Sequence, residues 1–221
     1  MSAYGAIAAP ESKGPLEIRS WPLPVEGLVL ITYPITGSDA PQEVIEYLFR
    51  VFEEELEGGR TYPQEGPLSL EGFTSYFFGS TTIVGVVQST SEEVKKTIGE
   101  ALKGKKLEDA LAGCYYIKPN YPGRSSHVIQ WQNGGFLVPP TQRGRKIGLT
   151  LGKSYLLYAP ELGYRGSVFN LVYKNNVPSL AIWDQLGFQR VGEIPNAGRL
   201  KTGPNGAEEY VDAVIVYKSF V

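Results

Sequence analysis

Residues 134–148 read GGFLVPPTQRGRKIG, and this stretch determines how the neighbouring segments fold. An apolar run at residues 134–138 leads into a basic loop with Gly144 and Gly148, and an amphipathic helical pattern follows. The free N–H groups of such a loop and the positive end of the helix converge on one place, where they favour a phosphate. We therefore predict a strand, a phosphate-binding loop and a helix, in that order.

The segments after this helix repeat the alternation of strand and helix. Residues 168–172 form an apolar run interrupted by Asn170, which predicts a buried strand. Asn176 is a favourable helix N-cap and Pro178 suits a first helical turn, so a second helix is expected there. Two strands at residues 189–194 and 209–217, joined by a long turn that contains residues 204–206 (Pro-Asn-Gly), are expected to close the chain.

The first half of the chain contains three further helical patterns. Apolar residues at i, i+4, i+7 and i+8 predict a helix from residue 41 that ends at Gly58 and Gly59. Ser69 is a suitable N-cap for the next helix. The charged segment 91–106 carries apolar residues at i+4 spacing and predicts a third helix.

β-Branched and apolar runs predict the strands of this first half at residues 16–21, 27–33, 81–88 and 111–118. A polar connection is expected at residues 119–132. We therefore predict an α+β fold with a mixed twisted β-sheet flanked by helices. One domain (residues 16–221) is expected to follow a flexible N-terminal tail (residues 1–15).

Composition narrows the classes of protein and of partner. The 221 residues carry a net charge of −2 and the pI is about 5.6, which argues against a nucleic acid or an anionic membrane as partner. The single cysteine excludes an internal disulfide framework and fits a reducing compartment. Neither a secretory signal nor an apolar run of membrane-spanning length is found, so a cytoplasmic location is expected, with a mitochondrial pool left open.

Two competing phosphate-binding motifs fail on spacing. Gly152-Lys153-Ser154 imitates the end of a Walker A motif, but Gly148 is one residue too close and the lysine falls inside the predicted helix. No GxGxxG opens a strand–helix–strand unit, so a dinucleotide fold is poorly supported. For the loop at residues 143–148, the alternative to a phosphate site is a helix N-terminus with solvated charges.

The second predicted helix carries a spaced set of five residues. Asn176 is followed by Ser179, Trp183, Gly187 and Phe188 at i+3, i+7, i+11 and i+12. Together with the basic loop, this pattern resembles the acetyl-CoA signature of the GCN5-related N-acetyltransferases (GNAT). The resemblance implies a GNAT-type domain with acetyl-CoA or CoA as co-substrate and no metal. It implies these cofactor-binding residues: Leu137, Val138, Arg143, Gly144, Arg145, Lys146, Ile147, Gly148, Asn176, Ser179 and Trp183.

Two residues depart from the family pattern. Lys146 stands where the family has a glycine before Ile147, so a slightly different backbone path is expected for the loop. Trp183 stands where the family often has a tyrosine that protonates the departing thiolate. An indole N–H does not ionise usefully, so protonation must come from water or another group.

A closer resemblance covers about residues 45–200. Residues 60–64 (RTYPQ), 116–121 (YIKPNY), 168–172 (VFNLV) and 182–184 (IWD) are similar to the fungal proline-analogue acetyltransferases, which share both departures. This resemblance implies N-acetylation of azetidine-2-carboxylate, cis-4-hydroxyproline or related imino acids, as in detoxification of proline analogues. It also implies a homodimer.

The expected acceptor site combines this resemblance with residue chemistry. Asn170 is the catalytic candidate, because a buried amide needs partners and can orient an imino nitrogen, although it is not a strong base. A sheet-edge asparagine satisfied by backbone is the alternative. Asn133, Phe136, Leu171 and Tyr62 are the expected substrate-binding residues. A turn residue (Asn133), a core aromatic (Phe136) and a structural Tyr-Pro loop (Tyr62) are the alternatives.

Three functions stay open at this point. The leading one is acetyl-CoA-dependent N-acetylation of small cyclic imino acids by direct attack of the amine on the thioester. The second keeps the cofactor and takes another small amine or amino acid, a polyamine or a peptide N-terminus. The third is a non-catalytic acyl-CoA-binding module. His127 is a minor candidate for a base, and Cys114 in a strand is expected to be a buried, inert thiol.

Overall fold

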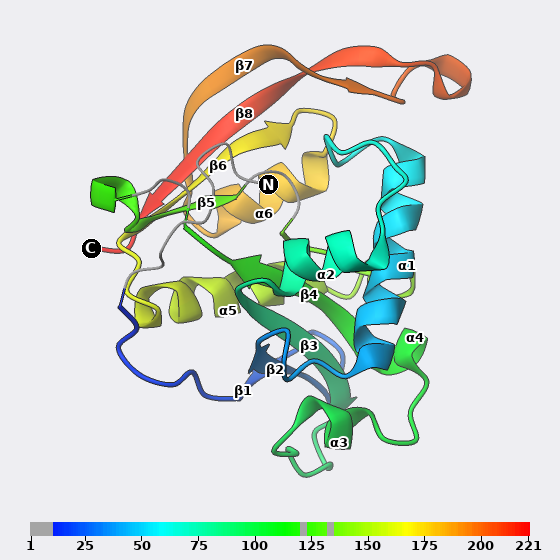
Figure 1. Cartoon of the computed structure of the whole chain (residues 1–221), viewed down its shortest axis with the longest axis vertical. Helices are drawn as coiled ribbons and strands as arrows, with labels where there is room; N and C mark the ends of the chain where they lie inside the picture. The colour runs from blue at the N-terminus through cyan, green and yellow to red at the C-terminus, as the bar shows by residue number, and fades with distance from the viewer. Residues whose placement is uncertain (1–10, 120–122, 132–134) are drawn as a thin grey trace.

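The computed structural model describes residues 11–119, 123–131 and 135–221, and these form two four-stranded sheets (Figure 1). The strand order of the first sheet is β1-β2-β3-β4, and each neighbouring pair is antiparallel. Its strands are β1 (Arg19–Pro22), β2 (Leu28–Ile35), β3 (Thr81–Ser89) and β4 (Leu111–Ile117). All of β4 is buried, because both faces of this sheet are covered.

Helices α1 (Gln42–Gly58) and α2 (Leu70–Phe78) pack on one face of the first sheet. The predicted apolar stripe of α1 is buried, and Gly59 ends the helix in a left-handed conformation. Ser69 caps α2, since its Oγ accepts a hydrogen bond from the Gly72 N–H at 3.0 Å. Helix α5 (Ile147–Glu161) packs on the opposite face.

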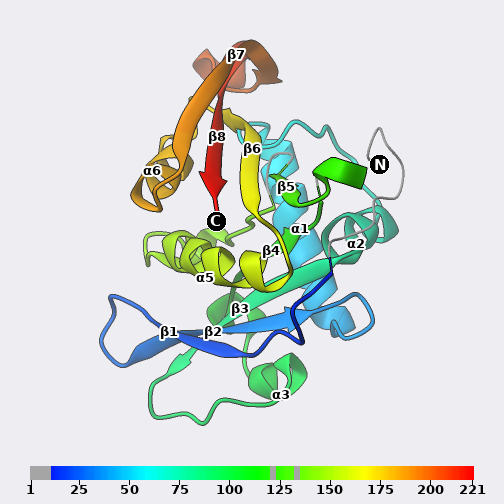
Figure 2. The same cartoon turned by 90° about the vertical axis from the view of Figure 1, so that its left-hand side faces the viewer.

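The second sheet has the order β5-β6-β8-β7, in which β5 and β6 are parallel and the other pairs antiparallel. Its strands are β5 (Val128–Trp131), β6 (Gly166–Tyr173), β8 (Glu209–Ser219) and β7 (Gln189–Leu200). Helix α6 (Val177–Gln185) follows β6 and shares a core with α5. Figure 2 shows α5 between the two sheets, and the β7–β8 hairpin projecting beyond β6.

The described chain also contains short 3-10 helices at Gly123–Ser125, Pro140–Gln142 and Pro204–Gly206. No helix of the described residues is long and apolar enough to cross a membrane. The predicted α+β class is confirmed. Strand β5 was missed, because the prediction assigned residues 119–132 to a polar connection.

Leu137 lies outside the named strands and forms an isolated antiparallel bridge with Cys114 on β4. The N–H of each residue donates to the carbonyl of the other at 2.9 Å. This approach requires Gly113, where a Cβ atom would lie 2.4 Å from the Leu137 carbonyl oxygen. In the described part of the predicted strand at 134–138, only this bridge pairs with a sheet.

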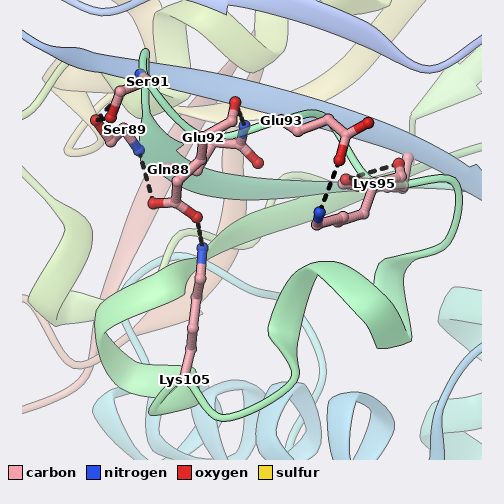
Figure 3. A network of polar contacts seen from close by, with 8 residues as sticks. Gln88, Ser89, Ser91, Glu92, Glu93, Lys95 and Lys105 are labelled. Carbon is pink, nitrogen blue, oxygen red and sulfur yellow. Dashed lines mark hydrogen bonds and ion pairs between the residues drawn. The ribbon is translucent and has the colours of Figure 1, made fainter.

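The predicted helix at residues 91–106 is wrong in its extent. Only α3 (Ile98–Leu102) and, just beyond, α4 (Leu107–Ala110) are helical. Thr97 and Glu100 form a capping box that fixes the start of α3. Before it, the Glu92 carboxylate accepts from the Ser89 N–H at 3.1 Å and from Lys105 at 2.5 Å, which holds a loop together (Figure 3).

Candidate active site

A cavity of about 720 Å³ lies between helix α6, strand β6, the loop before α5 and the end of α1. Asn170 and Arg145 do not line it, and Asn133 lies outside the described residues. The other predicted site residues all line it: Tyr62, Phe136, Leu137, Val138, Arg143, Gly144, Lys146, Ile147, Gly148, Leu171, Asn176, Ser179 and Trp183.

The loop before α5 presents an uncapped helix N-terminus to this cavity. Lys146 is the N-cap residue of α5 and makes no side-chain capping bond, so its first-turn N–H groups are available to an anion. Lys146 has φ 62° and ψ 15°, the left-handed conformation that glycine adopts readily. Gly144 also has a positive φ of 78°. Lys146 therefore has a backbone conformation that a glycine would adopt without strain, and this conformation is strained for a lysine.

Two arginines of the loop have different partners. Arg143 donates from Nε to the Val138 carbonyl at 3.2 Å and forms an ion pair with Glu55 at the end of α1. Thr61 donates to the same Glu55 carboxylate at 3.0 Å. Arg145 instead donates to the Oε1 of Gln142 at 2.6 Å, and of these two residues only Gln142 lines the cavity. Only Arg143 and Lys146 thus bring cationic side chains to the cavity wall from this loop.

Helix α6 brings three predicted residues to the cavity. Asn176 caps the helix, with its Oδ1 accepting from the Ser179 N–H at 3.3 Å. This confirms the capping role of Asn176, and its Nδ2 group is left for other partners. The Trp183 Nε1–H donates to the Ser179 Oγ at 3.0 Å. The indole therefore acts as a donor within the helix.

Aromatic rings fix the position of Trp183. Its ring centroid lies 4.4 Å from that of Phe169 and 5.1 Å from those of Phe136 and Phe188. The side chain is 6% exposed. Such close packing leaves the indole no second rotamer without disturbing the core.

Asn170 lies at an irregularity of β6. The register between β6 and β8 shifts after Phe169, so Asn170 and Leu171 form a β-bulge before Val172. The Asn170 Oδ1 is buried and has no hydrogen-bond partner among the described residues. Its neighbours Phe169 and Leu171 line the cavity. A buried acceptor left unpaired is costly, so it marks a position prepared for a donor.

Tyr62 and Leu137 shape the opposite wall. The Tyr62 hydroxyl donates to the Phe136 carbonyl at 3.3 Å, and burial raises the pKa of Tyr62 well above its usual range, so the phenol stays neutral. The Leu137 N–H is engaged by Cys114. The Val138 N–H has no acceptor among the described residues, so it can donate to a group bound in the cavity.

Other titratable groups lie away from the cavity lining. His127 is exposed, and burial raises the pKa of the Cys114 thiol, which is therefore inert. Lys118 donates to the Tyr76 carbonyl at 2.8 Å, and burial lowers its pKa to about 8. No group of three or more His, Cys, Asp or Glu in the described part of the chain could hold a metal ion.

The structure adds residues that the sequence pattern did not indicate. Glu55 reaches the cavity from the end of α1, Thr61 from the loop after α1, and Tyr173 from the end of β6. Tyr173 packs directly on Gly198, where a Cβ atom would lie 2.4 Å from its hydroxyl. Tyr173, an aromatic residue at the end of the strand that contains Asn170, could have been predicted from the sequence, whereas Glu55 belongs to no motif.

Comparison with other proteins agrees with this geometry, although no family model matches the chain. The N-acetyltransferase aca1 of Schizosaccharomyces pombe is 39% identical over 180 residues, which cover 81% of each protein. Protein SPT10 of Saccharomyces cerevisiae is 29% identical over 220 residues, covering 85% of this chain and 33% of SPT10.

Solved structures share the fold. A GCN5-related N-acetyltransferase from Kribbella flavida superposes with a TM-score of 0.65 at 23% identity, covering 86% of this chain and 97% of that protein. The putative acetyltransferase yncA from Salmonella typhimurium, solved with acetyl-CoA, has a TM-score of 0.62 at 11% identity over 87% and 94% of the two chains. The solved structures thus show a fold of the GNAT type, and the S. pombe relative places the chain among the N-acetyltransferases. The chain belongs to the N-acetyltransferase family of S. pombe aca1.

Proposed function

We propose that this enzyme transfers the acetyl group of acetyl-CoA to the ring nitrogen of small cyclic imino acids such as azetidine-2-carboxylate and cis-4-hydroxyproline. The observation that carries the proposal is the buried, unpaired Oδ1 of Asn170, which does not itself line the cavity but lies at the bulge of β6 between the lining residues Phe169 and Leu171. A neutral secondary amine carries one N–H, and one amide oxygen accepts it. Accepting this hydrogen bond orients the nitrogen lone pair toward the thioester, which is the catalytic role that we assign to Asn170.

The walls of the cavity suit a small apolar ring. Tyr62, Phe136 and Leu171 contribute aromatic and aliphatic surface beside the bulge. We assign these three residues to the imino-acid ring, and Asn133 to its polar groups on the family resemblance alone.

The cofactor is assigned to the other end of the cavity. The first-turn N–H groups of α5 and the residues 143–148 hold the pyrophosphate, helped by the charges of Arg143 and Lys146. Leu137 and Val138 line the thioester arm, and the Val138 N–H donates to the carbonyl oxygen as negative charge develops on it. Asn176 uses the Nδ2 group that capping leaves free to bind a pantetheine carbonyl.

An acceptor assay tests the substrate class. Purified enzyme with acetyl-CoA is given azetidine-2-carboxylate, cis-4-hydroxyproline, linear amino acids, a polyamine and a short peptide, and a thiol reagent reports CoA release. Release with the cyclic imino acids above the rate without acceptor supports the proposal. CoA release with only the linear acceptors would refute the imino-acid assignment, while the assignment as an acetyltransferase would still hold.

One observation favours a second acceptor class, namely that the Glu55 carboxylate lines the cavity and can attract a cationic amine. Its ion pair with Arg143 and its bond from Thr61 already engage it, so we rank this alternative second. The same acceptor assay separates the two classes.

We also propose a homodimer of a single acetyltransferase domain (residues 16–221) in the cytoplasm. The projecting β7–β8 hairpin supports the dimer, since Val191, Ile194 and Tyr210 are exposed along it. Sedimentation of the purified chain tests this assembly, and a monomer at micromolar concentration contradicts it.

A further inference from the structure

We propose that the Ser179 hydroxyl donates the hydrogen bond that stabilises the departing CoA thiolate, and that Trp183 holds it in position. This role rests on the proposed acetyl transfer and assigns the step that the tryptophan itself cannot perform. It makes Ser179 a catalytic residue and Trp183 a positioning residue.

The hydrogen-bond pattern on α6 makes the Ser179 hydroxyl an acceptor of one bond and leaves its hydrogen to donate. Its Oγ accepts from the Trp183 Nε1–H at 3.0 Å, while the Ser179 backbone N–H is engaged by Asn176. A serine hydroxyl has one hydrogen to donate and two lone pairs to accept with. Among the described residues no acceptor takes the Ser179 hydroxyl hydrogen. Ser179 and Trp183 both line the cavity, so an acceptor inside the cavity can take that hydrogen.

The packing of Trp183 makes this arrangement rigid. Phe136, Phe169 and Phe188 surround the indole, so the N–H cannot turn away from Ser179. Acceptance of the indole hydrogen bond also polarises the serine hydroxyl and strengthens it as a donor. The buried tryptophan thus supplies orientation and polarisation, while the serine supplies the contact with the cavity.

The chemistry of the step balances without an ionised serine. The amine nitrogen forms the new C–N bond, the C–S bond breaks and its electron pair goes to sulfur. The amine nitrogen loses one proton and the sulfur gains one proton, and solvent carries this proton. Ser179 keeps its own proton and donates a hydrogen bond to the sulfur while charge is greatest there, which lowers the barrier to C–S cleavage.

A pair of nearly isosteric variants tests the hydroxyl. Ser179→Val removes it and Ser179→Thr keeps it, so the two side chains differ in one polar group. We expect Ser179→Val to lower kcat roughly 10- to 100-fold, the effect of one hydrogen bond to a charged group, and Ser179→Thr to lie within about threefold of the wild type. CoA affinity, measured by calorimetry, should change by less than about threefold in both.

A second pair of variants tests the link to the indole. Trp183→Phe removes the N–H and should lower kcat, whereas the same change in the Ser179→Val background should have little further effect. Additive losses would show that Trp183 acts independently of Ser179. Equal kcat in Ser179→Val and wild type would overturn the proposal. Absence of turnover in the wild type with every acceptor would instead contradict the proposed acetyl transfer, so the two failures are distinct.

Discussion

Lys146 joins the phosphate loop to α5 with a backbone that its side chain disfavours. Its φ of 62° is the left-handed conformation, which costs a non-glycine residue about 1–2 kcal/mol. The residue lines the cavity, so the strain is located at the cofactor site. A lysine at this position lowers the stability of the protein and places a positive charge beside the proposed pyrophosphate.

Lys146→Gly should therefore raise the free energy of unfolding by up to about 1 kcal/mol and weaken CoA binding several-fold. Thermal unfolding and calorimetric titration with CoA measure the two effects. Lys153→Gly is the matched control, because Lys153 is exposed inside α5, where glycine costs about 1 kcal/mol. Opposite changes in stability for the two variants are expected. A fall in stability for Lys146→Gly contradicts the strain at this position.

Asn170 is the second residue whose environment predicts an effect. Asn170→Ala removes the unpaired Oδ1, so kcat with a cyclic imino acid should fall about tenfold or more. CoA affinity should stay within about threefold, because the cofactor is held by the loop and α6. Steady-state kinetics and calorimetry separate these quantities. A variant with normal turnover and weakened CoA binding would remove the catalytic role.

At the scale of elements, β4 pairs through Cys114 with Leu137, a residue that lines the cavity. In this bridge the Leu137 N–H donates to the Cys114 carbonyl, whereas the Val138 N–H has no acceptor within the described part of the chain. This close approach depends on Gly113, whose missing side chain leaves room for the Leu137 carbonyl.

Gly113→Ala should break the bridge, because its Cβ would lie 2.4 Å from the Leu137 oxygen and its φ of 140° disfavours a side chain. We expect a loss of about 1–3 kcal/mol in unfolding free energy, with a large fall in kcat. Gly99→Ala in helix α3 is the control, since the nearest atom to its Cβ is 3.8 Å away and alanine favours a helix. Equal stability of the two variants would contradict the structural role of Gly113.

Prediction from sequence succeeded where one element carries its own signal. Helix α1 has an apolar stripe and a glycine stop, and α6 has its Asn176 cap. Prediction failed where contacts between residues distant in the sequence determine the secondary structure. The segment before Thr97 has a helical period, but the bonds of Glu92 to Ser89 and Lys105 hold it as a loop. β7 extends to Leu200, beyond the predicted end at residue 194.

The same distinction applies to the site. The loop and α6 motifs predicted most of the residues that line the cavity, because spacing along a loop or helix fixes their common side. Glu55 enters from a helix almost ninety residues before Arg143, and only the folded chain brings them together. The bulge at Asn170 depends on register with β8, which no local pattern shows.

At the scale of the whole molecule, Lys118 makes stability depend on pH. Burial lowers its pKa to about 8 in the folded state, below the ordinary 10.5. Between these values Lys118 binds more protons in the unfolded chain than in the folded one, so its own contribution to the free energy of unfolding rises with pH from about 8 to 10.5. Lys118→Met should flatten that rise in unfolding free energy measured by urea titration. A rise of the same size in the variant contradicts this assignment.

One cavity is lined by the loop before α5, by Ser179 and Trp183 of α6 and by Leu171 at the bulge of β6. The most direct test of the proposed reaction is a competition between azetidine-2-carboxylate and a linear amino acid of similar size for limiting acetyl-CoA, with products identified by mass spectrometry. We predict that the ring-N-acetylated product dominates, with a kcat/KM ratio of about tenfold or more in its favour. Equal acetylation of the two acceptors, or a preference for the linear one, would contradict the proposed specificity.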